Sequence, residues 1–208
     1  MSINANVLKR FIIYMAILTF VMFTVWAFVK SFMNRPAGDY ETEVCDIRLK
    51  DKEYEKALDA ANKALKKTPN HRGAVMCKAL VFISQKKYIK ANEELTGLII
   101  FLEKNLDDDD KTGIGTLAAA YANRGIIKDR NKDYQGALED YVRALGVDHE
   151  AVAGPGLGTV ILNYKFKSSS VRERALYLNE QLQLPENERI LSIKELDEGQ
   201  VMHKPGKL

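Results

Sequence analysis

The sequence has 208 residues, of which 46% are hydrophobic and 28% are charged, so it has the size of one ordinary globular domain and a multidomain enzyme is not expected. Residues 1–36 contain four basic residues and no acidic one, and the other 27 basic and 28 acidic residues give the rest a net charge of −1. The overall charge of +3 therefore belongs to the N-terminal segment, and the body lacks the basic excess of a nucleic-acid-binding surface.

The segment from Phe11 to Val29 has nineteen residues, none of them charged and only two of them threonine. A helix of this length matches the hydrocarbon core of a bilayer, which is about 30 Å thick. A secretory signal peptide is the competing interpretation, but its apolar region spans about 7 to 15 residues and ends in a small-residue cleavage site. The sequence therefore favours an uncleaved membrane anchor over residues 11–30.

Basic residues on both sides of the anchor bear on its orientation. Lys9 and Arg10 favour an N-terminus on the cytoplasmic side, although Lys30 and Arg35 nearly balance them. A short leader before an anchor is typical of segments that export the chain on their C-terminal side. We expect a single-pass protein whose body lies on the non-cytoplasmic, periplasmic side of a bacterial inner membrane, and a cytosolic body is the alternative.

Three segments of the body repeat one pattern, in which a tyrosine is followed three residues later by an alanine. Tyr54 and Tyr88 are 34 residues apart, and Tyr134 follows after 46, which is one further period plus an insertion of 12. Apolar or small residues recur after each tyrosine at helical spacing and form a stripe that one helix cannot bury alone. The pattern predicts stacked helix pairs. The repeated pairs are Tyr54 and Ala57, Tyr88 and Ala91, and Tyr134 and Ala137.

This period and pattern resemble the tetratricopeptide repeat (TPR), a helix-turn-helix unit of 34 residues. The resemblance implies an all-α fold, with an N-terminal transmembrane helix followed by a TPR-like right-handed α-solenoid of 3–4 helix pairs. Pro69 closes the first unit at the position of the family's proline. Arg124 and Lys128 occupy usually apolar positions in the third unit's first helix, which leaves the packing register of that helix open.

After Leu145 the pattern fades. Residues 154–158 (GPGLG) are typical of a helix start, and Ser168–Ser170 predict the cap of a further helix that ends before Pro185. We expect the chain to be loose from His203 onward. The expected organisation is a leader (1–10), the anchor (11–30), a linker (31–37), three TPR-like units (38–150) with an insertion near 104–117, a degenerate fourth unit or capping helices (151–185), and a tail (186–208).

The two cysteines lie in the first helices of adjacent predicted units. Cys45 occupies the small-residue position that Ala79 and Gly125 occupy in the next two units, which favours buried free thiols. A disulfide with Cys77 is the alternative if the body is exported.

No group of residues in the sequence indicates an enzyme, a metal site or a cofactor. His71, His149 and His203 have no partner at ligand spacing, and GPGLG lacks the Lys-Ser/Thr of a phosphate loop. The acidic run Asp107–Asp110 precedes a helix, where negative charge is favoured, and it lacks the alternating spacing of a calcium loop. A partner-binding loop is the other interpretation of this run.

In the TPR family the first helices line a concave groove, and the resemblance carries this role to matching positions here. The matching residues would make the groove acidic at one end and apolar in the middle. Members that dock the C-terminal carboxylates of heat-shock chaperones use Lys, Asn and Arg there, and of these only Asn123 matches by type. The groove residues are Thr42, Glu43, Asp46, Lys50, Met76, Cys77, Leu80, Ile83, Ala122, Asn123, Ile126, Asp129 and Arg130.

The resemblance implies a membrane-anchored module for protein–protein interaction, acting as an assembly factor, scaffold or accessory subunit of a membrane complex. Its partner would be a protein that offers a helix or extended segment with an apolar core and some positive charge. No nucleic acid, small-molecule substrate or cofactor is expected. The alternative function is a chaperone-like holdase near a translocon that binds unfolded segments in the groove.

Overall fold

A computed structural model describes residues 5–33, 35–150, 152, 170–193, 200 and 202–203, and within these residues the regular structure is helical. The chain divides into two compact units, residues 1–37 and 38–208. The predicted helix start at GPGLG lies outside the described residues. The confirmed part of the prediction is the fold class, an all-helical chain with one long apolar helix near its N-terminus.

The first unit contains helix α1, Ala5–Met33. Its span Asn6–Lys30 has a mean hydropathy of 2.3, and none of the tested window is buried. The Thr19 hydroxyl donates to the Met15 carbonyl oxygen at 2.8 Å, and the Thr24 hydroxyl donates to the Val21 carbonyl oxygen at 2.8 Å. These bonds satisfy both hydroxyls inside the helix, as an apolar surrounding requires. By length and composition α1 suits a membrane span, although a signal sequence has the same properties.

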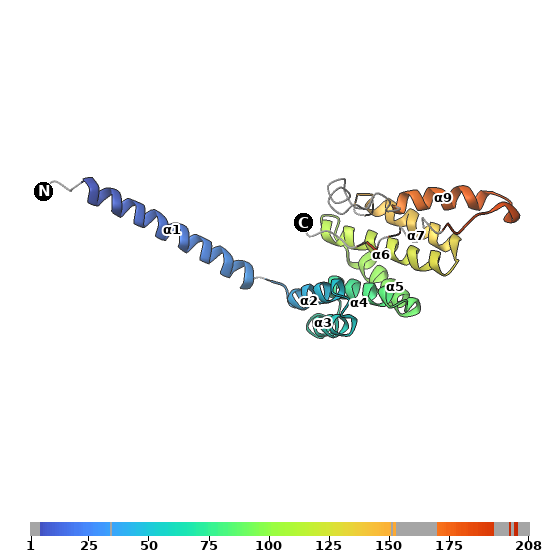
Figure 1. The fold of residues 1–208 in the computed structure, drawn as a ribbon, viewed down its shortest axis with the longest axis horizontal. Coiled ribbons are helices and arrows are strands. Elements are labelled where there is room, and N and C mark those ends of the chain that lie inside the picture. The colour runs from blue at the N-terminus through green and yellow to red at the C-terminus, as the bar shows by residue number, and fades with distance from the viewer. Residues whose placement is uncertain are drawn as a thin grey trace. The chain divides into compact units, whose positions relative to one another are not determined.

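The second unit is a stack of antiparallel helices (Figure 1). The second helix of each unit begins at its repeated tyrosine: Tyr54, Tyr88 or Tyr134. The helices are α2 (Asp39–Lys50), α3 (Tyr54–Lys67), α4 (Arg72–Ser84), α5 (Tyr88–Asn105), α6 (Lys111–Arg130), α7 (Tyr134–Val147) and α9 (Val171–Gln183), followed by the 3-10 helix Glu186–Glu188.

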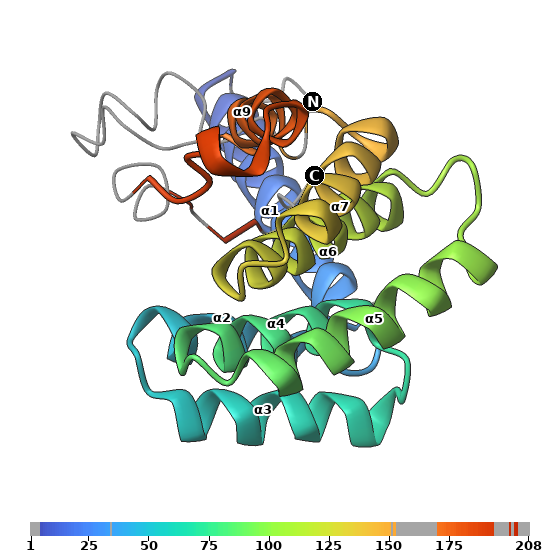
Figure 2. The same cartoon turned by 90° about the vertical axis from the view of Figure 1, so that its right-hand side faces the viewer.

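The helices pair and stack in chain order, from α3 at the bottom of Figure 2 to α9 at the top. α2 pairs with α3, α4 with α5 and α6 with α7. The first helices also pack on one another, because α2 contacts α4 and α4 contacts α6. Among the described helices, no contact of similar extent joins α3 to α5 or α5 to α7. The stack is therefore tighter along the first helices, as on the inner side of a curved solenoid.

Equivalent positions of the three units are buried in the same way. The alanines that follow the tyrosines, Ala57, Ala91 and Ala137, are fully buried. The next core position holds Ala61, Leu95 and Tyr141, all with no exposed surface. The repeat pattern therefore predicts the core, because each position faces the same neighbouring helices in its own unit.

The turn inside each unit has one geometry, shown here for the first. Lys52 lies in the left-handed region at a φ of 60°, its N–H donates to the Leu49 carbonyl, and the Glu53 N–H donates to that of Arg48. This is the Schellman ending of a helix, in which glycine is the usual left-handed residue. Lys86 and Lys132 take the same place in the next two units, at φ values of 58° and 66°.

Asp140 on α7 explains the charged residues at apolar positions of α6. Its carboxylate accepts hydrogen bonds of 2.8 and 2.7 Å from Arg124, and Lys128 lies 2.9 Å away. This contact raises the pKa of the Arg124 guanidinium. The register of α6 is also fixed by Gly125, where an added Cβ would lie 2.7 Å from the Tyr141 ring. The two helices thus cross closely at Gly125, beside an ion pair in which Asp140 is buried and Arg124 is partly buried.

Cys45 and Cys77 form a disulfide between α2 and α4, with their Cα atoms 6.4 Å apart. The expectation of free thiols was wrong. The small-residue position of Cys45 faces α4 of the next unit, and this places its side chain opposite that of Cys77. Both cysteines are fully buried, in a core with Ala57, Ala61 and Val81.

Candidate binding groove

The inner face of the first helices contains the predicted groove residues. At its α2 end, Thr42, Glu43 and Asp46 are half-buried and Lys50 is exposed. The Thr42 hydroxyl donates to the Gly38 carbonyl at 2.9 Å, so its hydrogen atom is already bonded to the start of α2. This end of the groove is polar and accessible.

The middle of the groove comes from α4 and is apolar. Met76, Leu80 and Ile83 are each 3% exposed or less, and Cys77 is in the disulfide. These side chains belong to the same core as the inner face of α6. The apolar middle is therefore covered in this structure.

On α6, four of the five predicted groove residues are also buried. They are Ala122, Asn123, Ile126 and Asp129. Arg130, at the end of the helix, is exposed, and its guanidinium lies 5.9 Å from the centre of the Tyr88 ring. The polar groups of this buried face find partners in the C-terminal part of the chain.

Asn123 binds the main chain of His203. The His203 N–H donates to the Asn123 Oδ1 at 2.8 Å, and the Asn123 Nδ2 donates to the His203 carbonyl oxygen at 2.7 Å. His203 is 8% exposed, and desolvation lowers the pKa of its imidazole from 6.5 to about 4. The expectation that the chain is loose from His203 onward was wrong for His203 itself.

Asp129 is the centre of a buried polar network. It accepts two hydrogen bonds of 2.7 Å from Arg174 of α9 and one of 3.2 Å from the Tyr141 hydroxyl. The Gln200 amide donates to Asp129 at 2.8 Å. Burial, followed by the charge and hydrogen bond of Asp129, raises the pKa of Tyr141 well above its usual value. Helix α9 and the tail therefore meet the repeat at one carboxylate.

Helix α9 starts as the sequence predicts. The Ser170 hydroxyl accepts from the Glu173 N–H at 3.2 Å, and the Glu173 carboxylate accepts from the Ser170 N–H at 3.0 Å. This capping box fixes the first turn. Val171, Ala175 and Leu178 then pack into the main core, against which α9 lies beside α7.

The acidic run 107–110 has a structural role at its last residue. Asp110 caps α6 by accepting from the Gly113 N–H at 2.8 Å and pairs with Arg72 at the start of α4. The hydrogen bonds from Arg72 and Gly113 lower the pKa of the Asp110 carboxyl. The other three aspartates of the run are exposed.

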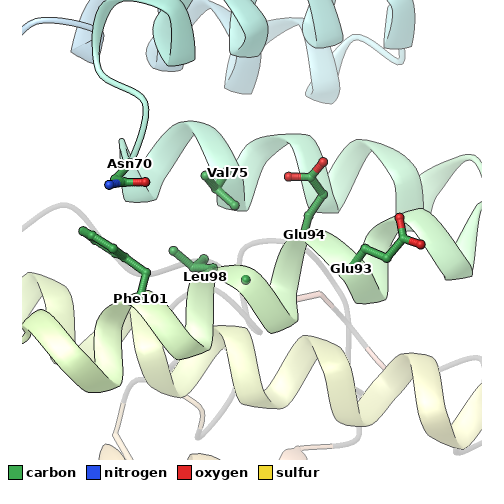
Figure 3. Close-up of a pocket in the computed structure, with 7 residues that line it drawn as sticks. Asn70, Val75, Glu93, Glu94, Leu98 and Phe101 are labelled. Carbon is green, nitrogen blue, oxygen red and sulfur yellow. The ribbon is translucent and has the colours of Figure 1, made fainter.

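A cavity of about 340 Å³ lies outside the predicted groove, between α4, α5 and the connection before α4 (Figure 3). Val75, Leu98 and Phe101 provide its apolar wall, and Glu93 and Glu94 lie at one end. Glu94 pairs with Lys78 at 2.6 Å. This cavity shares no residue with the inner face of the first helices.

The helix pairs and their packed first helices define the body as a solenoid of the TPR type. The first TPR of Spaghetti (RPAP3), bound to an HSP90 peptide, has a TM-score of 0.50 with this chain at 15% identity, covering 71% of this chain and 94% of its own. The TPR domain of Arabidopsis OM64 has a TM-score of 0.45 at 17% identity, covering 66% of this chain and 95% of its own. The TPR domain of Sgt2 from Aspergillus fumigatus has a TM-score of 0.47 at 19% identity, covering 77% of this chain and 93% of its own. No protein-family model and no curated protein matches the chain.

Sequence reasoning singled out Asn123 and Asp129 but missed their partners. The structure brings Asn123 to His203 and Asp129 to Arg174, across 80 and 45 residues of chain. Nothing in the spacing of these residues signals the pairing. The one clue in the sequence was the type of Asn123, a side chain that can both donate and accept.

Proposed function

We propose that this protein is a membrane-anchored scaffold that holds a segment of another protein in the groove of its TPR-like body. It would serve as an assembly factor or accessory subunit of a membrane complex. The observation that carries the proposal is the buried amide of Asn123, which lies on the inner face of the first helices and binds main chain through both its oxygen and its nitrogen. A surface with this ability recognises peptide segments.

The anchor supports a partner within the membrane. α1 contains a candidate membrane span of 25 residues with a mean hydropathy of 2.3, and tethering raises the effective concentration of the body for proteins of the same bilayer. The disulfide supports a body on the non-cytoplasmic side, because such bonds persist in oxidising compartments and are rare in the cytosol. A cytosolic body is the alternative.

Site-specific crosslinking in intact membranes tests the proposal. Photoreactive residues replace the exposed groove residues Lys50 and Arg130, and a control replaces Val142, which is exposed on the second helix of the third unit. We expect one set of membrane proteins to crosslink from both groove positions and not from Val142. Equal crosslinking from all three positions, or none from the groove, would contradict the scaffold role.

The same experiment separates the second candidate function, a holdase near a translocon. This candidate requires the covered apolar residues Met76, Leu80 and Ile83 to become exposed, because unfolded segments bind through apolar side chains. A holdase would crosslink to many unrelated proteins, and the yield would fall when synthesis of new membrane proteins is blocked. A scaffold would give a few partners at constant yield.

A further inference from the structure

The C-terminal segment is held to the inner face of α6 by its main chain. Asn123 binds both the N–H and the carbonyl oxygen of one residue, His203, as two opposed residues do in an antiparallel ladder. Both hydrogen bonds are made by backbone atoms that every residue except proline carries. The contact therefore recognises a chain segment and does not depend on the side chain at position 203.

Gln200 and Met202 add further contacts of this segment with the body. The Gln200 amide donates to Asp129 at 2.8 Å and to the Tyr141 hydroxyl at 3.3 Å, and Met202 packs against the main core. The His203 side chain lines a small cavity with Ile126 of α6 and Val171 of α9. The segment thus lies across residues that the resemblance assigns to partner binding.

We propose that the C-terminal segment, through Gln200, Met202 and His203, is an intramolecular ligand of the groove, which a partner segment must displace in order to bind. This inference rests on the proposed function for the identity of the competitor, but the docking of the segment rests on its own hydrogen bonds and packing. A second chain cannot pair with Asn123 in the same way while His203 does, because the Asn123 Nδ2 donates to the His203 carbonyl oxygen and to the Met76 sulfur and so has no further N–H to offer.

The strength of the docking suits exchange. Four hydrogen bonds and the packing of Met202 hold the described residues of the segment, and no ion pair or disulfide among these residues adds to them. The chain that links it to α9 keeps it near the site at an effective concentration on the order of millimolar. A partner in the same membrane is also kept close to the groove, so its effective concentration is comparable and it can compete with the segment.

A fluorescent peptide of residues 198–208 serves as the probe, and the protein is the full chain in nanodiscs or the chain lacking residues 198–208. We expect the shortened chain to bind the peptide at least about tenfold more tightly, since the full chain must first release its own segment. Circular dichroism and the thermal midpoint check that the shortened chain is folded. Equal affinity for both folded chains, or no binding to the shortened one, would overturn the proposal.

A matched pair of full-length variants covers the case in which the shortened chain does not fold. His203→Pro removes the backbone N–H that donates to Asn123, whereas His203→Ala keeps it. We expect His203→Pro to bind the peptide about tenfold more tightly than His203→Ala does. If the two variants bind the peptide equally, the main-chain contact does not gate the site and the proposal fails.

The two proposals fail separately. Absence of crosslinks from Lys50 and Arg130 would remove the scaffold role and leave the peptide result standing. If the partner set from the crosslinking experiment binds the full and shortened chains equally well, the segment is a fixed cap and the displacement proposal is wrong, while the scaffold role is unaffected.

Discussion

The carboxylate of Asp129 and the guanidinium of Arg174 form a bidentate ion pair in which both side chains are at most 3% exposed. Asp129 lies near the end of α6, which is the first helix of the third unit. Arg174 comes from α9, beyond the last predicted repeat. The pair therefore joins the C-terminal helix to the solenoid. Because charges in a buried site lose their hydration, each depends on the other for compensation.

Arg174→Met should lower the free energy of unfolding by about 3 to 5 kcal/mol, because Asp129 is left charged in a buried site. The double change Asp129→Asn with Arg174→Met should cost less than the single one. Urea unfolding measures both. Lys63→Met is the control, since its pair with Asp59 is exposed on both sides and its loss should leave the urea midpoint almost unchanged. Additive costs in the double variant would contradict the coupling.

The disulfide predicts that no thiol reacts before reduction. Denatured membranes treated with a maleimide polymer should show no shift of the chain on a gel, and two added labels after reduction. Reduction should lower the free energy of unfolding by about 3 to 4 kcal/mol, from the loop-closure entropy of the unfolded chain. The control variant Cys45→Ala with Cys77→Ala should be insensitive to reductant. Labelling without reduction would place the body in a reducing compartment.

Gly125→Ala should destabilise the third unit by about 1 to 3 kcal/mol, because the added carbon overlaps the buried Tyr141 ring. Gly97→Ala is the matched control in the middle of α5, where nothing lies within 4 Å of an added Cβ. This control should gain about 0.5 to 1 kcal/mol from the lower entropy of the unfolded chain. Thermal melts of the two variants should therefore move in opposite directions, and a shift in the same direction would argue against the close crossing.

Lys86→Gly should stabilise the chain, because Lys86 has a φ of 58° and is held in a left-handed conformation that glycine adopts freely. The expected gain is about 0.5 to 1 kcal/mol, after the greater entropy of glycine in the unfolded chain is subtracted. Lys87→Gly, one residue later and outside the left-handed region, is the control and should destabilise. Equal effects at both positions in urea unfolding would show that the turn conformation is not the cause.

Acid should release the C-terminal segment. The free segment has an ordinary histidine pKa near 6.5, and burial lowers that of docked His203 to about 4, so the released form binds the proton better. The free energy of docking therefore has its full value above pH 6.5. It becomes less favourable as the pH falls toward 4, by at most about 3 kcal/mol. Hydrogen exchange of the His203 amide at pH 7.5 and 5 measures this, with His203→Gln as the control. The same protection in the native chain at both values would contradict the prediction.

The repeat and the apolar N-terminal helix could be predicted because their signals are local. The apolar span of α1 needs only length and composition, and the tyrosine and alanine positions face the same neighbours within each helix pair. Tyr88 and Ala91, for example, lie in the first turn of α5, which pairs with α4 of the same unit, so one 34-residue period specifies both the turn and the core. The pattern accounts for burial at these positions without knowledge of the rest of the chain.

The tertiary structure alone decided the contacts between distant segments. Cys45 meets Cys77 only because adjacent first helices pack closely on the inner side of the stack, and Asn123 meets His203 across 80 residues because the tail returns to the inner face. Such contacts depend on the curvature of the solenoid and on where its end is capped, and neither is encoded in a residue spacing. The sequence by itself determined the helical repeat and its apolar N-terminal helix, and packing determined what fills the groove.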